Sequence, residues 1–540
     1  MAFLLLSAVA LALANHAIFN RYEPLNANIP FIILALEPPA LLLVFDEPFS
    51  FTRLIWAYTL FLFSTSASIV AYRLSPLHPL AQFEGPTLGK ISKLWGLWIA
   101  WHGHQHLYLK KLHDEYGPCV RTGPNELSIN DAAATLQILA SGGLEKGRFY
   151  SAGRPSSSPP SIVELAGDAH KAKRRVWNRA MAGEALRAYE FLIVKRATQL
   201  VARLAEEAQR GSVDLVAWFD FFALDLMGDL AFGEGFEMLQ DGKDATCLGE
   251  RIRIYTATSV LIGHIPWIGR TFHLIPQFRR LVREFSNFAL ALTIRRVERG
   301  GSVVKDLWYY LADEGDFEKV KPTLGDSAGD GIVAIIAASD TTAATLSSLV
   351  WFLLSNPECY RRVQREIDAV FGEGGDPLEM IGHEELQFLS ACINETLRLH
   401  PPVPSNGPRQ VDAGSGGRVI AGRFIPGGTT IYTPPYVLQR SPVYFSRPDD
   451  FAPERWLPGA DFEHHDLSAF VPFSLGPAGC VGQKLARREL LMVGSLLFKS
   501  FELRFADGFE GAMWPGGFRE FFVATRGPLR VSLTTRQGCA

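Results

Sequence analysis

Residues 472–486 read PFSLGPAGCVGQKLA, and this stretch contains one cysteine, Cys480, directly before a helical pattern. The free amides and the positive dipole end of a helix N-terminus favour a thiolate at that point. Gly476 and Gly482 allow backbone amides to approach the sulfur, and Phe473 can shield it from water. The pattern favours a metal ligand at Cys480. A small buried packing residue and a nucleophile with a histidine base are the alternatives.

Two segments that contain acidic and basic residues precede the cysteine in the sequence. NETLRLHPP contains Glu395 and Arg398, and FAPERW adds Arg455. One carboxylate shared by two guanidiniums makes charge-assisted hydrogen bonds that can lock a helix to the loop before the cysteine. A Glu–Arg pair three residues apart is common on helices and says little when it stands alone. The role predicted for the three residues together is structural.

A polar pair interrupts an apolar helical pattern at AIIAASDTTAATL, residues 334–346. The pair is Asp340 and Thr341. A threonine in mid-helix often donates a hydrogen bond to the carbonyl four residues back, which bends the helix. The alternative is an ordinary polar patch on a buried helix.

These segments, in this order, resemble the cytochrome P450 haem-thiolate monooxygenases, and several phrasings resemble fungal, membrane-anchored members. The cysteine loop is similar to the family pattern FxxGxRxCxG, and residues 337–342 are similar to [AG]GxDTT, with Ala338 at the usual glycine. The resemblance implies a haem b cofactor with Cys480 as its axial metal ligand. It places Ala337, Phe473, Gly476 and Gly482 at the cofactor.

The resemblance also implies roles in catalysis and in cofactor anchoring. Thr341 would hold a water and the distal oxygen, and Asp340 would relay protons from solvent. HKAKRR, residues 170–175, resembles the family's haem-edge segment and implies His170 and Arg174 as cofactor contacts.

One family position departs from the pattern, because Ala478 stands where the family has an arginine that pairs with a haem propionate. An alanine cannot make that pair. We expect Arg174, with His170 beside it, and Arg409 to take over the anchoring. We expect a solvent-facing surface that also meets the reductase to contain Lys171, Lys173 and Arg179.

The expected fold is mainly α with small β-sheets: a cytochrome P450 fold (α+β) preceded by N-terminal transmembrane helices. Helical patterns dominate the chain, and short strands are expected within 120–130 and 403–437. Residues 87–116 are expected to be helical, and 516–534 a closing hairpin. Further helices are predicted at 160–182, 184–210, 214–231, 272–300, 303–312, 326–354, 357–371, 384–399 and 482–499.

The first 75 residues predict a membrane anchor. Three apolar segments each approach the ~20 residues that cross a bilayer, although Glu37, Pro38 and Pro39 weaken the second. Two or three crossings are therefore expected, and three with the N-terminus outside place Arg21 in the cytosol. The expected location is the endoplasmic reticulum membrane. The predicted divisions are an anchor over 1–75, a proline-containing hinge over 76–93 and a cytosolic haem-binding catalytic domain over 94–540.

Bulk properties exclude some classes of protein. The 540 residues carry a formal net charge of −3, which gives no basic footprint for nucleic acid. Six cysteines without a CxxC pair do not form a disulfide framework. WHGHQH contains His102, His104 and His106, for which interfacial packing beside tryptophans is favoured over a metal site.

The implied function is oxidation of a hydrophobic small molecule, such as a fungal terpenoid, with O₂ and electrons from an NADPH–cytochrome P450 reductase. The segments expected to border the substrate are 255–272, 333–341 and 401–406. Membrane lipid is the other expected partner. One alternative is a reductase-independent isomerase or peroxide-rearranging enzyme. The other is a non-catalytic membrane scaffold with a decayed haem site.

Overall fold

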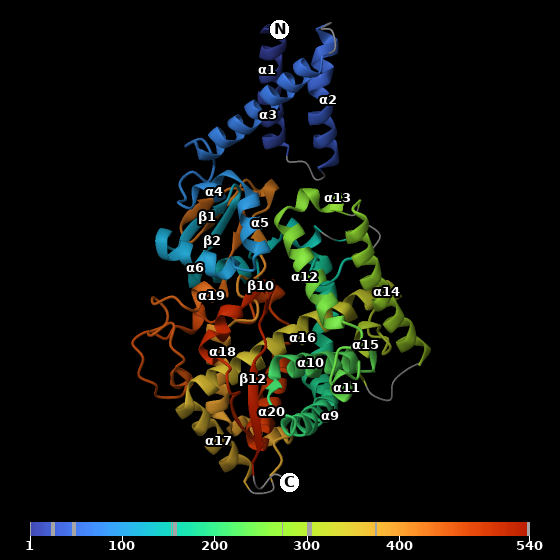
Figure 1. Ribbon diagram of the computed structural model, residues 1–540, viewed down its shortest axis with the longest axis vertical. Coiled ribbons are helices and arrows are strands. Elements are labelled where there is room, and N and C mark those ends of the chain that lie inside the picture. The colour runs from blue at the N-terminus through green and yellow to red at the C-terminus, as the bar shows by residue number, and fades with distance from the viewer. Residues whose placement is uncertain are drawn as a thin grey trace.

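A computed structural model describes residues 2–22, 27–45, 50–152, 154, 159–272, 274–299, 305–372 and 375–536 of the chain. A bundle of helices stands above a larger body, in which a small β-rich part lies beside a helical part (Figure 1). The expected fold class, mainly α with small sheets, is confirmed.

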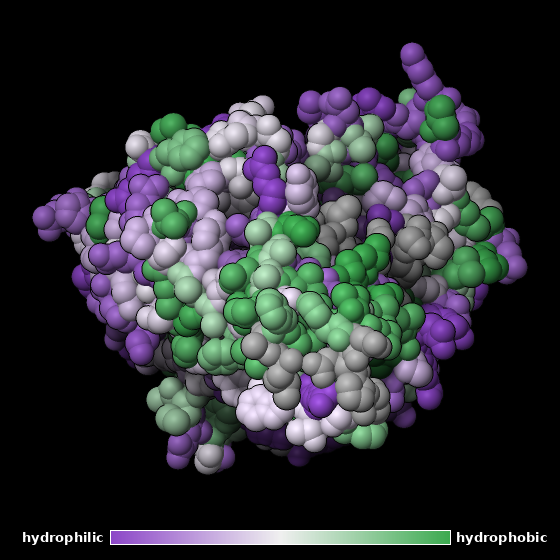
Figure 2. Space-filling view, turned by 90° about the horizontal axis from the view of Figure 1, so that it is seen from above, coloured by the Kyte–Doolittle hydropathy of each residue, from purple (hydrophilic) through white to green (hydrophobic). Residues whose placement is uncertain are grey.

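The bundle consists of α1 (Ala2–Arg21), α2 (Asn28–Val44) and α3 (Phe51–Leu74). Helices α1 and α3 are long and apolar enough to cross a membrane, and α2 is a shorter apolar helix. Ala8 and Ala12 on α1 pack against Phe61 on α3, and all three are fully buried. Apolar side chains gather at the centre of the view down onto this end of the molecule, with polar side chains around them (Figure 2). The bundle therefore has the packing and the outer surface of a membrane anchor.

The residues that weaken the second apolar segment lie inside the bundle. Asn15 on α1 donates a hydrogen bond to the Glu37 carboxylate, and α2 continues through Pro38 and Pro39. A polar pair between helices satisfies groups that lipid would leave without partners. Glu37 is thus compatible with a membrane position for α2.

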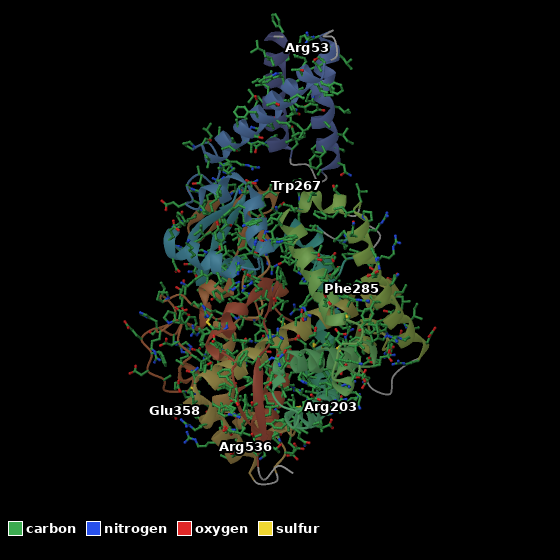
Figure 3. The ribbon with its side chains drawn as sticks, viewed as in Figure 1. Arg53, Arg203, Trp267, Phe285, Glu358 and Arg536 are labelled. Carbon is green, nitrogen blue, oxygen red and sulfur yellow. The ribbon has the colours of Figure 1, made fainter. Side chains whose placement is uncertain are left out.

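The bundle touches the body at two places. Below α3, the Nη1 atom of Arg73 donates to the carbonyl oxygen of Ile91 over 2.6 Å. At the start of α2, the amide of Ala27 donates to the carbonyl of Trp267 over 2.9 Å. Figure 3 shows Trp267 at the top of the body, directly under the bundle, and Arg53 at the bundle's far end.

The helical part of the body is organised around α16, which runs through its interior and packs against α10, α18 and α20. This helix is also long and apolar enough to span a membrane, but most of it is buried in the body. The remaining α-helices are α4 (Thr87–Ile91), α5 (Lys93–Trp101), α6 (Gln105–Tyr116), α7 (Ala132–Leu139), α8 (Gly167–Ala180), α9 (Gly183–Ala208), α10 (Leu215–Phe232), α11 (Met238–Asp241), α12 (Leu248–His264), α13 (Gly269–Phe272), α14 (Pro276–Glu298), α15 (Leu307–Leu311), α16 (Leu324–Ser355), α17 (Pro357–Phe371), α18 (Gln387–Leu399), α19 (Pro435–Leu438) and α20 (Gln483–Ser500).

The largest sheet has the strand order β1-β2-β8-β5-β3, in which β2 and β8 are parallel and the other pairs antiparallel. Three smaller sheets are the hairpins β6–β7 and β10–β11 and the set β4-β12-β9. The strands are β1 (Cys119–Gly123), β2 (Glu126–Ile129), β3 (Glu145–Lys146), β4 (Val213–Asp214), β5 (Arg409–Gln410), β6 (Arg418–Ile420), β7 (Arg423–Ile425), β8 (Thr430–Tyr432), β9 (Phe501–Phe505), β10 (Arg519–Phe521), β11 (Val523–Thr525) and β12 (Arg530–Thr535).

Two expectations need correction, and one helix was not predicted. Residues 87–116 form three helices, because Ser92 caps α5 with its side chain and Gly103 adopts a φ of +68°. The expected hairpin over 516–534 is wrong as a single unit: β10 and β11 pair with each other, whereas β12 pairs with β9. Helix α12 was not predicted, since its buried positions show no clear helical stripe. The expected helices at 272–300 and 303–312 lie partly outside the described residues.

Candidate active site around Cys480

The cysteine loop is a tight turn between η7 (Gly476–Ala478), a single 3-10 turn, and helix α20. Gly476 has a φ of +67°, and a Cβ atom there would lie 2.2 Å from the carbonyl oxygen of Leu139. No other residue fits, since the conformation and the space both require glycine. Closing the turn, the amide of Cys480 donates to the carbonyl of Phe473 over 2.8 Å.

The sulfur of Cys480 lies at the N-terminus of α20. The amides of Gly482 and Gln483 donate hydrogen bonds to it. Burial raises the pKa of the Cys480 thiol, while these two amides and the nearby Arg174 act in the opposite direction. One side of the residue remains exposed. Amide donors and a nearby cation are the groups that stabilise a thiolate, which is the form that binds a metal.

The three residues of the expected structural network meet in the interior. Arg398 donates to both carboxylate oxygens of Glu395 over 2.8 and 2.9 Å, and Arg455 donates over 3.1 Å. All three side chains have an exposed fraction of 0%. Burial alone would raise the pKa of Glu395, but the hydrogen bonds and charge of Arg398, the charge of Arg455 and the amide of Ala452 together outweigh it, and the pKa is lowered. The carboxylate is thus fixed in its charged form.

This network reaches the cysteine loop through one glutamine. Arg398 donates to the carbonyl of Gln439 over 2.9 Å, and the Gln439 side chain accepts from the amide of Val471, also over 2.9 Å. Val471 lies just before the loop. The network therefore connects α18 to the segment that carries Cys480.

The polar pair on α16 shows the expected local geometry at its threonine. The hydroxyl of Thr341 donates to the carbonyl of Ala337 over 2.8 Å. Thr341 is half-buried and Ala337 is exposed, so this turn of the helix borders accessible space inside the body. A back-bonded hydroxyl of this kind can exchange its partner for another acceptor.

Asp340 belongs to a group of charges drawn from three other elements. Burial and the charge of Asp220 on α10 raise the pKa of Asp340 to about 6, whereas Arg526 and Arg253 oppose the rise. Arg526 donates to Asp220 over 2.8 Å, and Arg253 on α12 lies 3.8 Å from the same carboxylate. A carboxyl with this pKa can both take up and release a proton near neutral pH.

A second carboxyl beside α16 was not predicted. Thr342 donates to Glu489 on α20 over 2.9 Å, and burial raises the pKa of Glu489 to about 7. The signal was present, because Glu489 falls between Leu485 and Met492 on the buried stripe of α20.

Four basic groups from separate elements gather beside the cysteine loop. Lys146 on β3 and Arg409 on β5 are register partners, and His170 and Arg174 come from α8. Burial together with Arg409 and Arg174 lowers the pKa of Lys146 to about 7. Burial together with Lys146 and Arg174 lowers the pKa of His170 to about 4. Positive charges close enough to lower the pKa of Lys146 and of His170 form a site for anions.

The cluster fits the two carboxylates of a haem. Arg409 is 5% exposed, and its Nη1 atom has no hydrogen-bond partner among the described residues. Tyr150 shares a hydrogen bond with the same guanidinium. A buried, unpaired guanidinium nitrogen is costly unless an anion completes it. Lys146 is the member that sequence reasoning missed, and its place opposite Arg409 depends on strand pairing.

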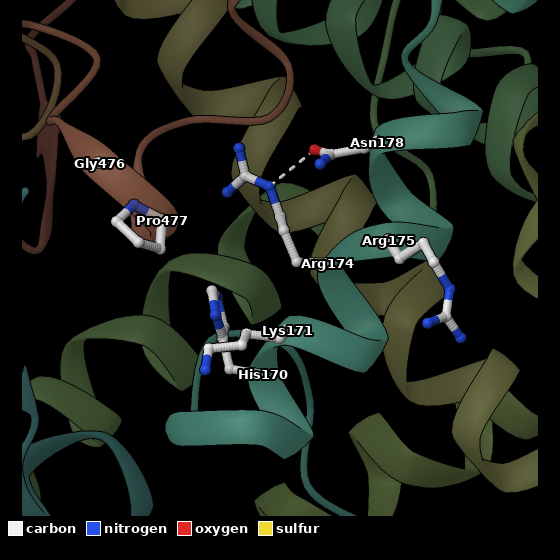
Figure 4. A pocket seen from close by; sticks show the side chains of 7 residues that line it. All are labelled: His170, Lys171, Arg174, Arg175, Asn178, Gly476 and Pro477. Atoms are coloured by element: carbon white, nitrogen blue, oxygen red, sulfur yellow. Dashed lines mark hydrogen bonds between the residues drawn. The ribbon is translucent and has the colours of Figure 1, made fainter. Parts of the chain in front are cut away.

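Arg174 joins this cluster to the cysteine loop. Its Nη1 atom donates to the carbonyl of Gly479 over 2.5 Å, and its Nε atom donates to Asn178 over 2.8 Å. A cavity of about 390 Å³ lies between α8 and the turn at Gly476 and Pro477 (Figure 4). The helix side of this cavity carries His170 and Arg174, so positive charge faces the loop.

The basic residues expected to face water divide into two kinds. Lys171 is exposed, with 73% of its side chain accessible. Lys173 does not face water in the expected way, because it points to α16 and pairs with the buried Asp330 over 2.8 Å. Arg179 pairs with Glu318 over 3.1 Å and is half-buried.

The three histidines of WHGHQH go to different environments. His102 is exposed and packs on Trp98, with ring centroids 4.3 Å apart. His104 precedes α6, and His106 is buried in the body. Packing beside tryptophan therefore describes His102, and His106 has a separate set of partners.

A family model described as Cytochrome P450 matches residues 86–514. The chain belongs to the cytochrome P450 family. The match includes the cysteine loop, the Glu395 network and the Asp340–Thr341 pair, and it begins within the segment expected to be a hinge. Membership identifies the chain as a monooxygenase, an oxidoreductase whose cofactor is a haem iron with a thiolate ligand.

Several curated fungal proteins are similar along nearly the whole chain. Tryprostatin B 6-hydroxylase of Aspergillus fumigatus is 31% identical over 95% of this chain and 90% of its own length. Cytochrome P450 monooxygenase FCK2 of Fusarium pseudograminearum is 33% identical over 87% of this chain and 84% of its own. Cytochrome P450 67 of Uromyces fabae is 31% identical over 98% and 99%, respectively. These monooxygenases generally act on hydrophobic substrates with a redox partner.

Proposed function

We propose that the protein is a membrane-anchored haem-thiolate monooxygenase that oxidises a hydrophobic fungal secondary metabolite, such as a terpenoid. One observation carries the proposal: two amides hold the Cys480 sulfur beside a cluster of four basic groups, one of which has a buried nitrogen with no partner in the described part of the chain. The relative named tryprostatin B 6-hydroxylase supports the class of reaction.

The residues divide into those that hold the cofactor and those that border it. Cys480 would hold the iron of haem b through its thiolate, and Arg409, Arg174, His170 and Lys146 would pair with the carboxylates of the cofactor. Bound haem would supply the activation of O₂ for oxidation of the substrate. The residues that border the cofactor are Phe473, Gly476, Gly482 and Ala337. Glu395, Arg398 and Arg455 keep the cysteine loop in place and do not touch the cofactor.

Proton movement is assigned to Asp340 and Thr341. Asp340 has a pKa of about 6 and lies within the influence of the Asp220 and Arg253 charges, so it can exchange a proton at the working pH. The Thr341 hydroxyl donates to the carbonyl of Ala337 at a partly exposed turn of α16, and it becomes a proton donor to another group when it exchanges this acceptor. Neighbouring acid and hydroxyl groups form a short relay.

Substrate and electrons arrive from different surroundings. The segments 255–272, 333–341 and 401–406 border the substrate, which enters from the lipid phase. The bundle α1–α3 holds the body at the endoplasmic reticulum membrane with the catalytic domain in the cytosol. Electrons come from an NADPH–cytochrome P450 reductase, and exposed Lys171 belongs to the face that an acidic partner contacts.

The decisive experiment is the carbon-monoxide difference spectrum of dithionite-reduced membranes that contain the full chain. The long-wavelength Soret band of a haem thiolate is expected for the wild type and is expected to be absent from Cys480→Ala. Cys247→Ala is the matched control, because Cys247 is also exposed but lies before α12. A protein made at normal levels without any haem band contradicts the proposal and favours the scaffold. Turnover without NADPH favours the isomerase alternative.

A further inference from the structure

A buried carboxylate outside the haem site holds one of the segments assigned to the substrate. Glu520 on β10 accepts a hydrogen bond from the amide of Ser405 over 2.9 Å and another from the Ser405 hydroxyl over 2.8 Å. Ser405 is 2% exposed and Glu520 5% exposed. Each carboxylate oxygen thus takes one bond from the same residue, which fixes the loop in two directions.

A histidine of WHGHQH lies close to Glu520 without forming a hydrogen bond to it. The Nδ1 atom of His106 lies 3.4 Å from a carboxylate oxygen of Glu520, and His106 is 1% exposed. The His106 ring packs edge-on against Tyr436 and Phe518, with centroids 4.9 and 5.3 Å away. The amide of Glu520 also donates to the carbonyl of Gly103 over 2.9 Å. Gly103 and His106 of this motif therefore help to hold the β10–β11 hairpin in place.

The hairpin contacts the 401–406 loop and packs against the two helices, α12 and α16, that contain residues of the other segments assigned to the substrate. Strand β10 packs against α12, and β11 packs against α16. The amide of Ala524 donates to the carbonyl of Pro402 over 2.8 Å. Between the strands, Phe522 adopts a φ of +71°, and its ring lies 6.5 Å from the rings of Phe149 and Tyr150. Such a conformation in a bulky residue persists only where the surroundings enforce it.

We propose that Glu520 is a positioning residue that sets the shape of the substrate site. It joins the 401–406 loop to the β10–β11 hairpin and thereby fixes Phe522 relative to that loop. Since both sides of the joint border the substrate, the carboxylate determines which part of a bulky molecule is presented for oxidation. This inference rests on the proposed function for its consequence, but the joint itself can be tested without catalysis.

The test uses the full-length protein with four single variants and one double variant. Glu520→Gln and Ser405→Ala weaken the joint with little change of volume. Glu366→Gln is the matched control for the first, because Glu366 also accepts two bonds, from the amides of Phe388 and Leu389 over 2.7 and 2.8 Å. For Ser405→Ala the control is Ser495→Ala, a buried serine that donates to the carbonyl of Met492 within its own helix.

Hydrogen–deuterium exchange measures the joint directly. We expect exchange over 401–406 and 521–525 to become about ten-fold faster in Glu520→Gln, the change given by losing one bond to a charged group. Both controls should leave these peptides unchanged. Ser405→Ala and Glu520→Gln combined should change exchange by less than the product of their separate effects, because the two groups act as a pair.

Azole binding to the haem-loaded protein measures the shape of the site. The dissociation constant of the bulky azole clotrimazole should rise several-fold in Glu520→Gln, while that of small 4-phenylimidazole stays within two-fold of wild type. Unchanged exchange in both peptides, or equal effects of Glu366→Gln on them, would overturn the inference. Faster exchange in a chain that binds no haem would retain the joint and reject the proposed function.

Discussion

Arg409→Ala is the most informative perturbation of cofactor anchoring, because Ala478 removes the family's usual partner for a haem carboxylate. Arg409 is 5% exposed and lies opposite Lys146 on the neighbouring strand, and one of its nitrogens has no hydrogen-bond partner among the residues that the structure describes. Its substitution removes the buried guanidinium that completes the cluster. We expect haem to dissociate faster from this variant than from the wild type.

The magnitude follows from the type of bond. A hydrogen bond to a charged group contributes about 1.5–3 kcal/mol, and about 1.4 kcal/mol corresponds to a factor of ten. The rate of haem loss should therefore rise about ten- to one-hundred-fold. The lower end applies if Lys146 moves into the place of the guanidinium, since removing Arg409 also removes a charge that depresses the pKa of Lys146.

The assay follows transfer of haem from full-length protein in detergent to an excess of an apo-globin. Two control variants separate the guanidinium from its surroundings. Tyr150→Phe removes one bond to Arg409 without removing its charge. Arg418→Ala removes an arginine on β6 that donates to the carbonyls of Gly142 and Gly143. Haem loss from Arg409→Ala that matches the wild type or Arg418→Ala refutes the assignment of Arg409 as an anchor.

Three other predictions follow from the buried charges. The pKa of Lys146 is lowered to about 7, and a haem carboxylate would raise it. Haem affinity should therefore be highest below pH 7 and fall above pH 7 by up to about ten-fold per pH unit. Lys146→Met should flatten this pH dependence. The pKa of Asp340 is raised to about 6, so this carboxyl stabilises the fold below its ordinary pKa and loses that effect as pH rises through 6. Asp340→Asn should increase the free energy of unfolding at pH 7 by about 1–3 kcal/mol and should slow turnover. Denaturant titration measures the first effect, and a product assay measures the second. Glu395→Gln removes the carboxylate that balances the charge of two buried arginines and should cost about 3–5 kcal/mol. The loss of haem-loaded protein, compared with the exposed Glu454→Gln, measures this cost.

Much of the helical architecture and the cysteine loop could be predicted because their determinants are local. Gly476, Cys480 and the start of α20 lie within a few residues of one another, and the turn they form follows from glycine conformation and helix polarity. Helix α16 was found from its long apolar pattern and ends within two residues of the predicted limits at 326 and 354. The bond from Thr341 to Ala337 likewise lies within one helical turn.

The parts that could not be predicted depend on partners far apart in the sequence. No helical or strand pattern around Glu520 indicates its role. The three residues that contact it come from the 401–406 loop and from the region of α6. Similarly, 516–534 reads as one hairpin because two strand-like runs follow each other, whereas β12 instead pairs with β9. Register between distant strands is set by the packed core and not by either strand alone.

The alanine at position 478, where the family has an arginine, is also explained by contacts between residues far apart in the sequence. The β3–β5 pairing sets Lys146 opposite Arg409, and α8 brings His170 and Arg174 to the same place. A further arginine in the loop would join a cluster in which the charges of Arg174 and Arg409 already lower the pKa of Lys146 and of His170, so it would add repulsion before any cofactor is present. With the anchoring charge on the sheet and on α8, position 478 can be apolar, and the loop is left to hold Cys480 by its amides. Haem binding in this chain is therefore expected to depend more on the pairing of β3 with β5 than on the loop that carries the ligand.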